Sequence, residues 1–258
     1  MNIKIKRILS KKNKSKIICL TSYSKNISEI LDKHTDIILV GDSLGSVLYS
    51  YDTTKKVTLK MMIEHSKSVR QGVKNSLMVV DMPYNSYNNK SIALKNAKKI
   101  IKYSKADAVK LEGGKRILNI IKHLKKNKIN VMGHLGILPQ SQIGKFRFKG
   151  KTTFERKSLL NDALLLQSSG VFSIVLECIE TKLAKEITKK LKIPTIGIGS
   201  SVNCDGQVLV TDDLVGLNLT SIKFVKNFYD IRKHFDLAVK KFVKEVKSKK
   251  YPSTKFSY

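Results

Sequence analysis

Eight short runs of apolar and β-branched residues alternate with segments of helical periodicity along this chain of 258 residues. Most of the runs are continuous rather than alternating, as strands buried on both faces require. Strands that alternate with helices form a parallel sheet, and eight such units in about 250 residues favour a closed barrel. The sequence therefore predicts an α/β fold, a (β/α)8 TIM barrel. The runs are 16–21, 36–40, 77–81, 108–111, 130–133, 173–176, 194–198 and 207–210.

The segments between these runs place apolar residues on one helical face. They are 26–34, 58–72, 91–104, 115–126, 154–169 and 181–192. After the eighth run, residues 212–216 predict only a short helix. The amphipathic segment 228–247 then predicts an extra C-terminal helix, which would pack on the barrel or on another subunit. Because no internal linker is visible, we predict a single domain over 1–258, with basic, mobile ends near 1–15 and 249–258.

The sequence carries no sign of a membrane or secreted protein. No apolar run approaches the roughly 18 residues that span a bilayer, and the basic start lacks the apolar core of a signal peptide. The three cysteines, Cys19, Cys178 and Cys204, lie far apart without a metal-ligand spacing, which is typical of reduced thiols. We therefore expect a cytoplasmic protein.

A formal net charge of +30 raises the possibility of a polyanion-binding protein. Arginine is the residue that recognises phosphates and bases with two parallel hydrogen bonds. Only six of the 50 basic residues are arginine, and the lysines are spread along the whole chain. We find no cluster of basic and aromatic residues, so the composition argues against nucleic acid as a partner and favours anionic small molecules.

Ionisable residues recur where the predicted strands end. Asp42 follows the second run, and Asp81 ends the third. In a barrel both carboxylates would point into the same mouth, where parallel-strand enzymes place their chemistry. A single aspartate there is often only a helix cap. Two at matching positions suit Mg²⁺, which takes oxygen ligands and keeps waters that a substrate can displace.

Three further strand ends carry candidate groups. Lys110 and Glu112 have the same strand parity, so they face the same way; they would hold an anionic substrate and a metal-bound water, or simply pair with each other. His134 lies between glycines, where a structural role and a hydrogen bond to substrate are both open. Glu177 ends the sixth run and is a candidate proton acceptor, with helix capping as its alternative. Together, a metal pair, a lysine and a separate carboxylate suggest enolate chemistry on a 2-oxo acid.

The segments that carry these residues resemble the ketopantoate hydroxymethyltransferase family. The matching segments occur in the same order as in the family, and they extend from about Lys16 to Leu217. The matching segments are Val40-Gly41-Asp42-Ser43-Leu44-Gly45, Val80-Asp81-Met82-Pro83, Ala108-Val109-Lys110-Leu111-Glu112-Gly113-Gly114, Val131-Met132-Gly133-His134-Leu135-Gly136, Pro139-Gln140-Ser141, Val175-Leu176-Glu177-Cys178, Ile193-Pro194-Thr195-Ile196-Gly197-Ile198-Gly199 and Cys204-Asp205-Gly206-Gln207-Val208-Leu209.

The resemblance implies a one-carbon transferase of pantothenate biosynthesis. Its reaction would move a hydroxymethyl group from 5,10-methylenetetrahydrofolate to 3-methyl-2-oxobutanoate, giving ketopantoate (2-dehydropantoate). It also implies Mg²⁺ and a homo-oligomer, commonly a decameric ring.

By motif position, the resemblance assigns roles to single residues. Asp42 and Asp81 would ligate Mg²⁺, and Glu112 would hold the metal site through water. Ser43 and Lys110 would bind the oxo acid together with Asp42 and Asp81, with His134 nearby. Glu177 would be the catalytic base that removes the proton at C3.

Two other functions remain as alternatives. A related Mg²⁺-dependent lyase or mutase acting on a 2-oxo acid would keep the metal residues and change the base. A polyanion-binding protein is motivated by charge alone. Glu177 and the Glu-Cys context favour the transferase over the lyase or mutase, and the lack of a clustered basic face with aromatic residues argues against the polyanion-binding protein.

Overall fold

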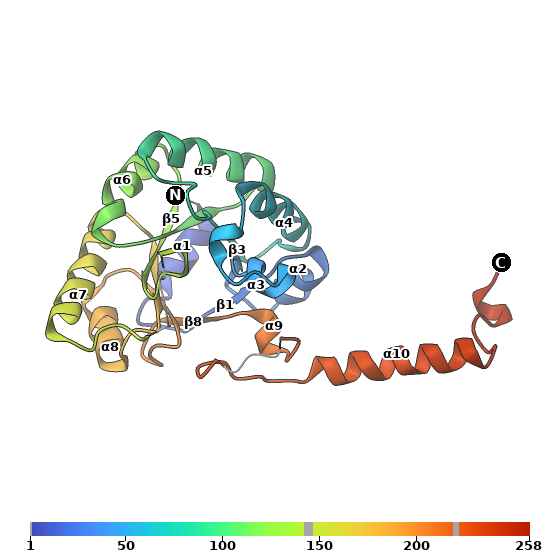
Figure 1. The fold of residues 1–258 in the computed structure, drawn as a ribbon. Coiled ribbons are helices and arrows are strands. Elements are labelled where there is room, and N and C mark those ends of the chain that lie inside the picture. Colours follow the sequence, from blue (N-terminus) through green and yellow to red (C-terminus); the bar gives the residue numbers. More distant parts are fainter. Residues whose placement is uncertain (1, 142–146, 219–221) are drawn as a thin grey trace. The chain divides into compact units, whose positions relative to one another are not determined.

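The computed structural model describes residues 2–141, 147–218 and 222–258. Eight parallel strands pair in chain order, and β8 pairs with β1 to close the barrel (Figure 1). The predicted (β/α)8 barrel is confirmed, and each predicted run overlaps an observed strand. The strands are β1 (Ile17–Thr21), β2 (Ile37–Val40), β3 (Leu77–Asp81), β4 (Ala108–Glu112), β5 (Val131–Gly136), β6 (Ser173–Glu177), β7 (Thr195–Ile198) and β8 (Gly206–Leu209).

Helices follow the strands as the periodicity predicts, and polar caps define where several of them begin. The Thr58, Asn89 and Thr152 side chains each accept a hydrogen bond from a backbone N–H in the first turn that follows. The helices of the barrel are α2 (Lys25–Leu31), α3 (Leu44–Tyr49), α4 (Leu59–Gly72), α5 (Lys90–Ser104), α6 (Leu118–Lys126), α7 (Thr153–Ser168) and α8 (Thr181–Lys190), with 3₁₀ turns η1 (Thr54–Lys56), η2 (Lys115–Ile117) and η3 (Pro139–Ser141).

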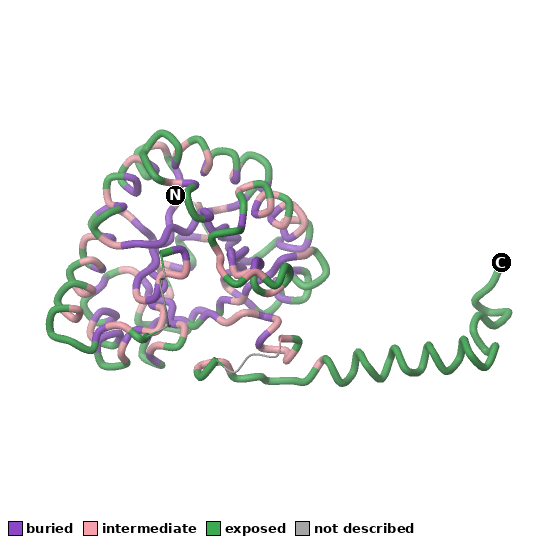
Figure 2. Tube along the Cα trace, viewed as in Figure 1, coloured by how far each residue is buried: buried purple, intermediate pink, exposed green. Residues whose placement is uncertain are grey.

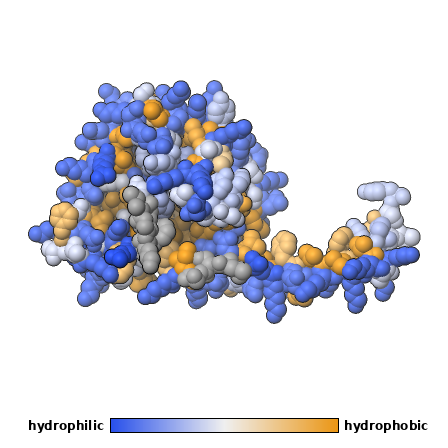
Figure 3. Space-filling model, viewed as in Figure 1, coloured by the Kyte–Doolittle hydropathy of each residue, from blue (hydrophilic) through white to orange (hydrophobic). Residues whose placement is uncertain are grey.

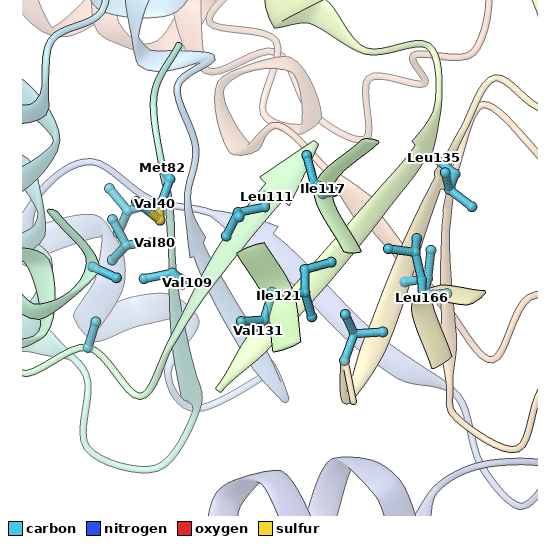
Figure 4. Close-up of a cluster of buried hydrophobic side chains, with 14 of the residues drawn as sticks. Val40, Val80, Met82, Val109, Leu111, Ile117, Ile121, Val131, Leu135 and Leu166 are labelled. Atoms are coloured by element: carbon cyan, nitrogen blue, oxygen red, sulfur yellow. The ribbon is translucent and has the colours of Figure 1, made fainter. Parts of the chain in front are cut away.

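The main apolar cluster lies between the strands and the surrounding helices. Val109 and Leu111 on β4 belong to it, together with Ile121 on α6 (Figure 4). Because side chains alternate along a strand, the neighbouring Lys110 and Glu112 point to the opposite side, into the barrel. The same alternation thus builds the apolar layer outside and presents charged groups inside.

An N-terminal helix, α1 (Ile3–Ser10), fills the end of the barrel opposite the strand carboxyl ends. Ile5 and Ile8 are buried among inward-facing residues near the amino ends of the strands, which include Ile17, Ile37, Leu77 and Ala108. The structure therefore differs from the mobile basic end expected near 1–15. Lys6 and Arg7 of this helix are exposed, and the Lys4 Nζ donates to the Ser76 carbonyl at 2.9 Å.

A buried ion pair joins this N-terminal segment to the barrel. The Lys12 Nζ lies 2.8 Å from the Asp205 Oδ2, and the two side chains are 8% and 4% exposed. Asp205 also accepts the Thr195 backbone N–H at 2.8 Å. The pair lies just before β8, so it connects the first helix of the chain to the last strand of the barrel.

Replacing Asp205 with alanine should lower the free energy of unfolding by roughly 3–5 kcal/mol, because it leaves a buried ammonium without its partner. Chemical denaturation followed by circular dichroism measures this loss. Asp236→Ala serves as the control, since Asp236 pairs with Lys240 on an exposed helix face, where such pairs contribute little. Equal losses in the two variants would contradict the proposed importance of the buried pair.

The chain divides into two compact units, residues 1–210 and 211–258, each described by itself. The second unit contains α9 (Thr211–Leu214), the predicted long C-terminal helix α10 (Ile231–Lys247) and the 3₁₀ turn η4 (Thr254–Phe256). No residue of α10 is buried (Figure 2). Among the described residues, no helix combines the length and the apolar character needed to cross a bilayer.

The hydrophilic side chains of the first unit are spread over its surface, as the even distribution of lysines along the sequence predicts. On the visible face of residues 1–210, hydrophilic side chains lie among apolar ones rather than in a single patch (Figure 3).

Candidate active site

The predicted site residues meet at the carboxyl end of the barrel, and strand register explains how. Asp81 on β3 is the register partner of Lys110 on β4. Glu112 on β4 is the register partner of His134 on β5. Glu177 ends β6 beside the end of β5. Because neighbouring parallel strands hold these residues side by side, the charged groups form one continuous cluster.

Asp42 and Asp81 are deeply buried carboxylates of this cluster, at 4% and 2% exposed. The Asp42 backbone N–H donates to the Asp81 Oδ2 at 3.1 Å. Burial raises the pKa of Asp42 well above its usual value, and the negative charges of Asp81 and Glu112 add to this effect. Burial also raises the pKa of Asp81, although Lys110 opposes it. Two buried carboxylates whose charges are disfavoured are suited to a cation.

The donor set fits a divalent cation that keeps part of its water. The Asp81 Oδ1 is buried, and within the described residues it makes no hydrogen bond, although the Lys110 Nζ lies 3.2 Å away. No three His, Cys, Asp or Glu side chains among residues 2–141, 147–218 and 222–258 are grouped closely enough to hold a metal by themselves. Two carboxylates with waters completing the shell are typical of Mg²⁺.

Lys110 provides the positive charge of the cluster. Its side chain is 5% exposed and faces Asp81 on one side. On the other side its Nζ lies 3.3 Å from the His134 Nδ1. Burial alone would lower the pKa of Lys110, but Asp81, Glu112 and Asp42 outweigh it and raise the pKa. The lysine is therefore a permanent cation at neutral pH.

His134 bridges two carboxylates, which is more than the sequence predicts for it. Its Nδ1 lies 3.5 Å from the Glu112 Oε1, and its Nε2 lies 3.2 Å from the Glu177 Oε2. Burial lowers the pKa of His134, but the two glutamates outweigh burial and raise the pKa to about 9. An imidazolium at neutral pH would thus connect Glu112 to Glu177.

Glu177 is the most accessible carboxylate of the cluster. Its side chain is 18% exposed, against 2% for Glu112. A proton acceptor must reach the substrate, whereas a group that holds a metal or its water can be buried. Glu177 meets this geometric requirement, and its role as the base stays a prediction.

Ser43 lies at the edge of the cluster, at the start of α3. Its hydroxyl shares a 2.8 Å hydrogen bond with the Tyr23 hydroxyl. The lack of a side chain at Gly41 leaves room for the Ser43 hydroxyl, since a Cβ at position 41 would lie 2.8 Å from the Ser43 Oγ. All seven predicted site residues are thus at the carboxyl end of the barrel. The Ser43 hydroxyl is bonded to Tyr23, which is not one of the seven.

Gln140 is a polar residue of the site that the sequence reasoning missed. It is 2% exposed, and its Nε2 donates to the Asp42 Oδ2 at 2.7 Å. The segment Pro139-Gln140-Ser141 is part of the family resemblance, but an amide has no charge or titration that marks it as functional. Its contact with Asp42, 98 positions earlier in the chain, is visible only in the fold.

Comparison with known proteins gives consistent matches over the whole chain. The sequence model described as ketopantoate hydroxymethyltransferase matches residues 2–254. A 3-methyl-2-oxobutanoate hydroxymethyltransferase of Pelagibacter ubique is 64% identical over 258 residues, covering 100% of both chains. The enzyme of that name from Anaplasma marginale is 44% identical, covering 100% of this chain and 94% of its own.

Among solved structures, a phosphonopyruvate hydrolase in complex with oxalate and Mg²⁺ has a similar fold. Its TM-score is 0.63, with 98% of this chain and 93% of the hydrolase covered. Sequence identity is only 9%, so this likeness supports the barrel architecture alone.

Proposed function

The chain belongs to the ketopantoate hydroxymethyltransferase family, and on that premise we propose that it transfers a hydroxymethyl group from 5,10-methylenetetrahydrofolate to 3-methyl-2-oxobutanoate with the aid of Mg²⁺. The product is ketopantoate. The observation that carries the proposal is the separation of two buried carboxylates, Asp42 and Asp81, from a third and more accessible one, Glu177. Such a site can hold a cation at one end and accept a proton at the other.

In the proposed reaction, Glu177 accepts the proton from C3 of the oxo acid. The C3 carbanion is conjugated with the 2-oxo group, and it forms a bond to the methylene carbon of the folate. The methylene carbon gives up both of its bonds to folate nitrogens, one to the new bond with C3 and one to the hydroxyl oxygen supplied by water. The proton removed from C3 and one proton of the water end on the two nitrogens, so tetrahydrofolate and ketopantoate are the products. A positioned base of this kind contributes about 10²–10⁴ in rate.

Other residues bind and orient the substrate in this proposal. The Lys110 ammonium, fixed by Asp81, neutralises charge on the oxo acid, and Ser43 offers a hydroxyl at the edge of the site. Asp42 and Asp81 would hold the metal, with Glu112 acting through water. When bound, Mg²⁺ would polarise the carboxylate and 2-oxo groups and so acidify the C3–H bond.

The direct test is product formation by the purified protein. With Mg²⁺, 3-methyl-2-oxobutanoate and methylenetetrahydrofolate, we expect ketopantoate to accumulate, measured by mass spectrometry. Reactions without folate and reactions with EDTA are the controls. If the oxo acid is consumed without folate and ketopantoate does not form, a lyase or mutase activity would replace the proposal.

The homo-oligomer implied by the resemblance remains a prediction for the whole protein. Light scattering of the purified chain measures its mass in solution and tests whether a decameric ring forms.

A further inference from the structure

We propose that Gln140 is a positioning residue that holds Asp42 and Glu112 in the orientation that binds the metal, with Tyr87 fixing the Gln140 amide. The inference rests on the proposed Mg²⁺ site and adds residues to it. It does not depend on which one-carbon donor the enzyme uses.

Gln140 contacts both carboxylates on the metal side of the site. Its side-chain Nε2 donates to the Asp42 Oδ2 at 2.7 Å, and its backbone N–H donates to the Glu112 Oε2 at 3.1 Å. Its Nε2 also donates to the Met82 carbonyl at 3.0 Å. Gln140, a residue of η3, thus connects three groups that lie at the carboxyl ends of β2, β3 and β4.

The orientation of the amide follows from its partners. The Met82 carbonyl can only accept hydrogen bonds, and so can the Asp42 carboxylate in the ionised form that binds a cation, so the nitrogen of the amide faces them. The amide oxygen then faces the Tyr87 hydroxyl, which donates to it at 2.5 Å. Tyr87 lies in the connection between β3 and α5, and its hydroxyl is also 3.5 Å from the Glu112 carbonyl. The Tyr87 hydroxyl can donate or accept, so a flip of the amide would cost the two hydrogen bonds that Nε2 donates to the Met82 carbonyl and to the ionised Asp42 carboxylate.

A neutral donor has a specific advantage at this position. It fixes one oxygen of Asp42 without adding a positive charge that would compete with a metal cation. The carboxylate is then confined to one rotamer while its other oxygen stays available. Outer residues that orient metal ligands in this way commonly account for 10–100-fold in metal affinity.

The test measures metal binding directly, in the absence of both substrates. Mn²⁺ replaces Mg²⁺ as a spectroscopic probe, and free Mn²⁺ is followed by electron paramagnetic resonance. Gln140→Met keeps the shape of the side chain but removes the amide, and we expect its Kd for Mn²⁺ to rise 10–100-fold. Tyr87→Phe keeps the ring and removes only the hydroxyl, so a smaller rise, of a few-fold, is expected.

The controls are variants of the same residue types on the surface. Gln71 is exposed on α4, and Tyr103 on α5 is 51% exposed. Gln71→Met and Tyr103→Phe should leave the Kd for Mn²⁺ unchanged. Thermal unfolding without metal separates positioning from folding, since the Gln140 and Tyr87 variants should melt near the wild type and lose only the Mn²⁺-dependent rise in melting temperature.

Turnover gives a second readout. At saturating Mg²⁺ the Gln140→Met enzyme should keep kcat within a few-fold, while the Mg²⁺ concentration needed for half-maximal rate rises with the Kd. A Kd for Mn²⁺ equal to the wild-type value in both variants would overturn the proposal. Absence of Mn²⁺ binding by the wild-type protein would overturn it too, together with the metal assignment, whereas ketopantoate formation tests the reaction itself.

Discussion

Asp81→Ala should reduce Mg²⁺-dependent turnover to the background rate while the barrel stays folded. Asp81 is 2% exposed and offers a buried oxygen that lacks a hydrogen bond within the described residues. Its removal would take away half of the proposed pair of metal carboxylates. Burial already disfavours the Asp81 charge, as its raised pKa indicates. After the substitution, the buried Lys110 ammonium still has the carboxylates of Glu112 and Asp42 nearby. The fold should therefore survive the loss of Asp81.

The measurement is the rate of ketopantoate formation across a Mg²⁺ titration, with circular dichroism as the check on folding. Asp42→Ala should behave in the same way. Asp52→Ala is the matched control, because Asp52 is 78% exposed and pairs only with Lys56 in the described contacts. Near-normal activity of the Asp42 and Asp81 variants at every Mg²⁺ concentration would show that the metal assignment is wrong.

Glu177→Gln should retain substrate and metal binding but lose proton exchange at C3 by about 10²–10⁴-fold. The amide has the same size as the carboxylate but cannot accept the proton. It also keeps an oxygen that can face the His134 Nε2, which lies 3.2 Å from Glu177 in the wild-type chain. The surrounding cluster should therefore keep its arrangement.

Deuterium incorporation into 3-methyl-2-oxobutanoate, followed by NMR without folate, isolates this step from the transfer that follows. Glu64→Gln is the control, since Glu64 is 57% exposed on α4 and pairs with Lys67. Undiminished exchange in Glu177→Gln would exclude Glu177 as the base.

The strands and the charged site were predictable because each depends on a local pattern. A strand buried on both faces needs a continuous apolar run, and 77–81 has the same bounds in the prediction and in the structure. The parity of Lys110 and Glu112 places both inside the barrel, as the structure confirms. For these charged residues, the residue type and its position at the end of a predicted strand were enough to predict that it lies in the site.

Other features depend on contacts between distant parts of the chain. Helix α1 has two buried isoleucines among lysines, and only the inward-facing strand residues explain why it packs. Gln140 is neutral, so nothing in its local sequence distinguishes it from a surface glutamine. The bridging role of His134 likewise needs the register of β4, β5 and β6. These relations arise from tertiary packing, which a single sequence does not display.

The position of α1 has a consequence for the order of events during synthesis. The helix is synthesised before all eight strands, yet Ile5 and Ile8 are buried against residues that extend to Val208 on β8. The ion pair between Lys12 and Asp205 likewise can form only after Asp205, 193 positions further along the chain, has been synthesised. Contacts between such distant positions form late and slowly. The apolar face of α1 is therefore fully covered only after β8 has been synthesised, and until then it is exposed to chaperones or to other nascent chains.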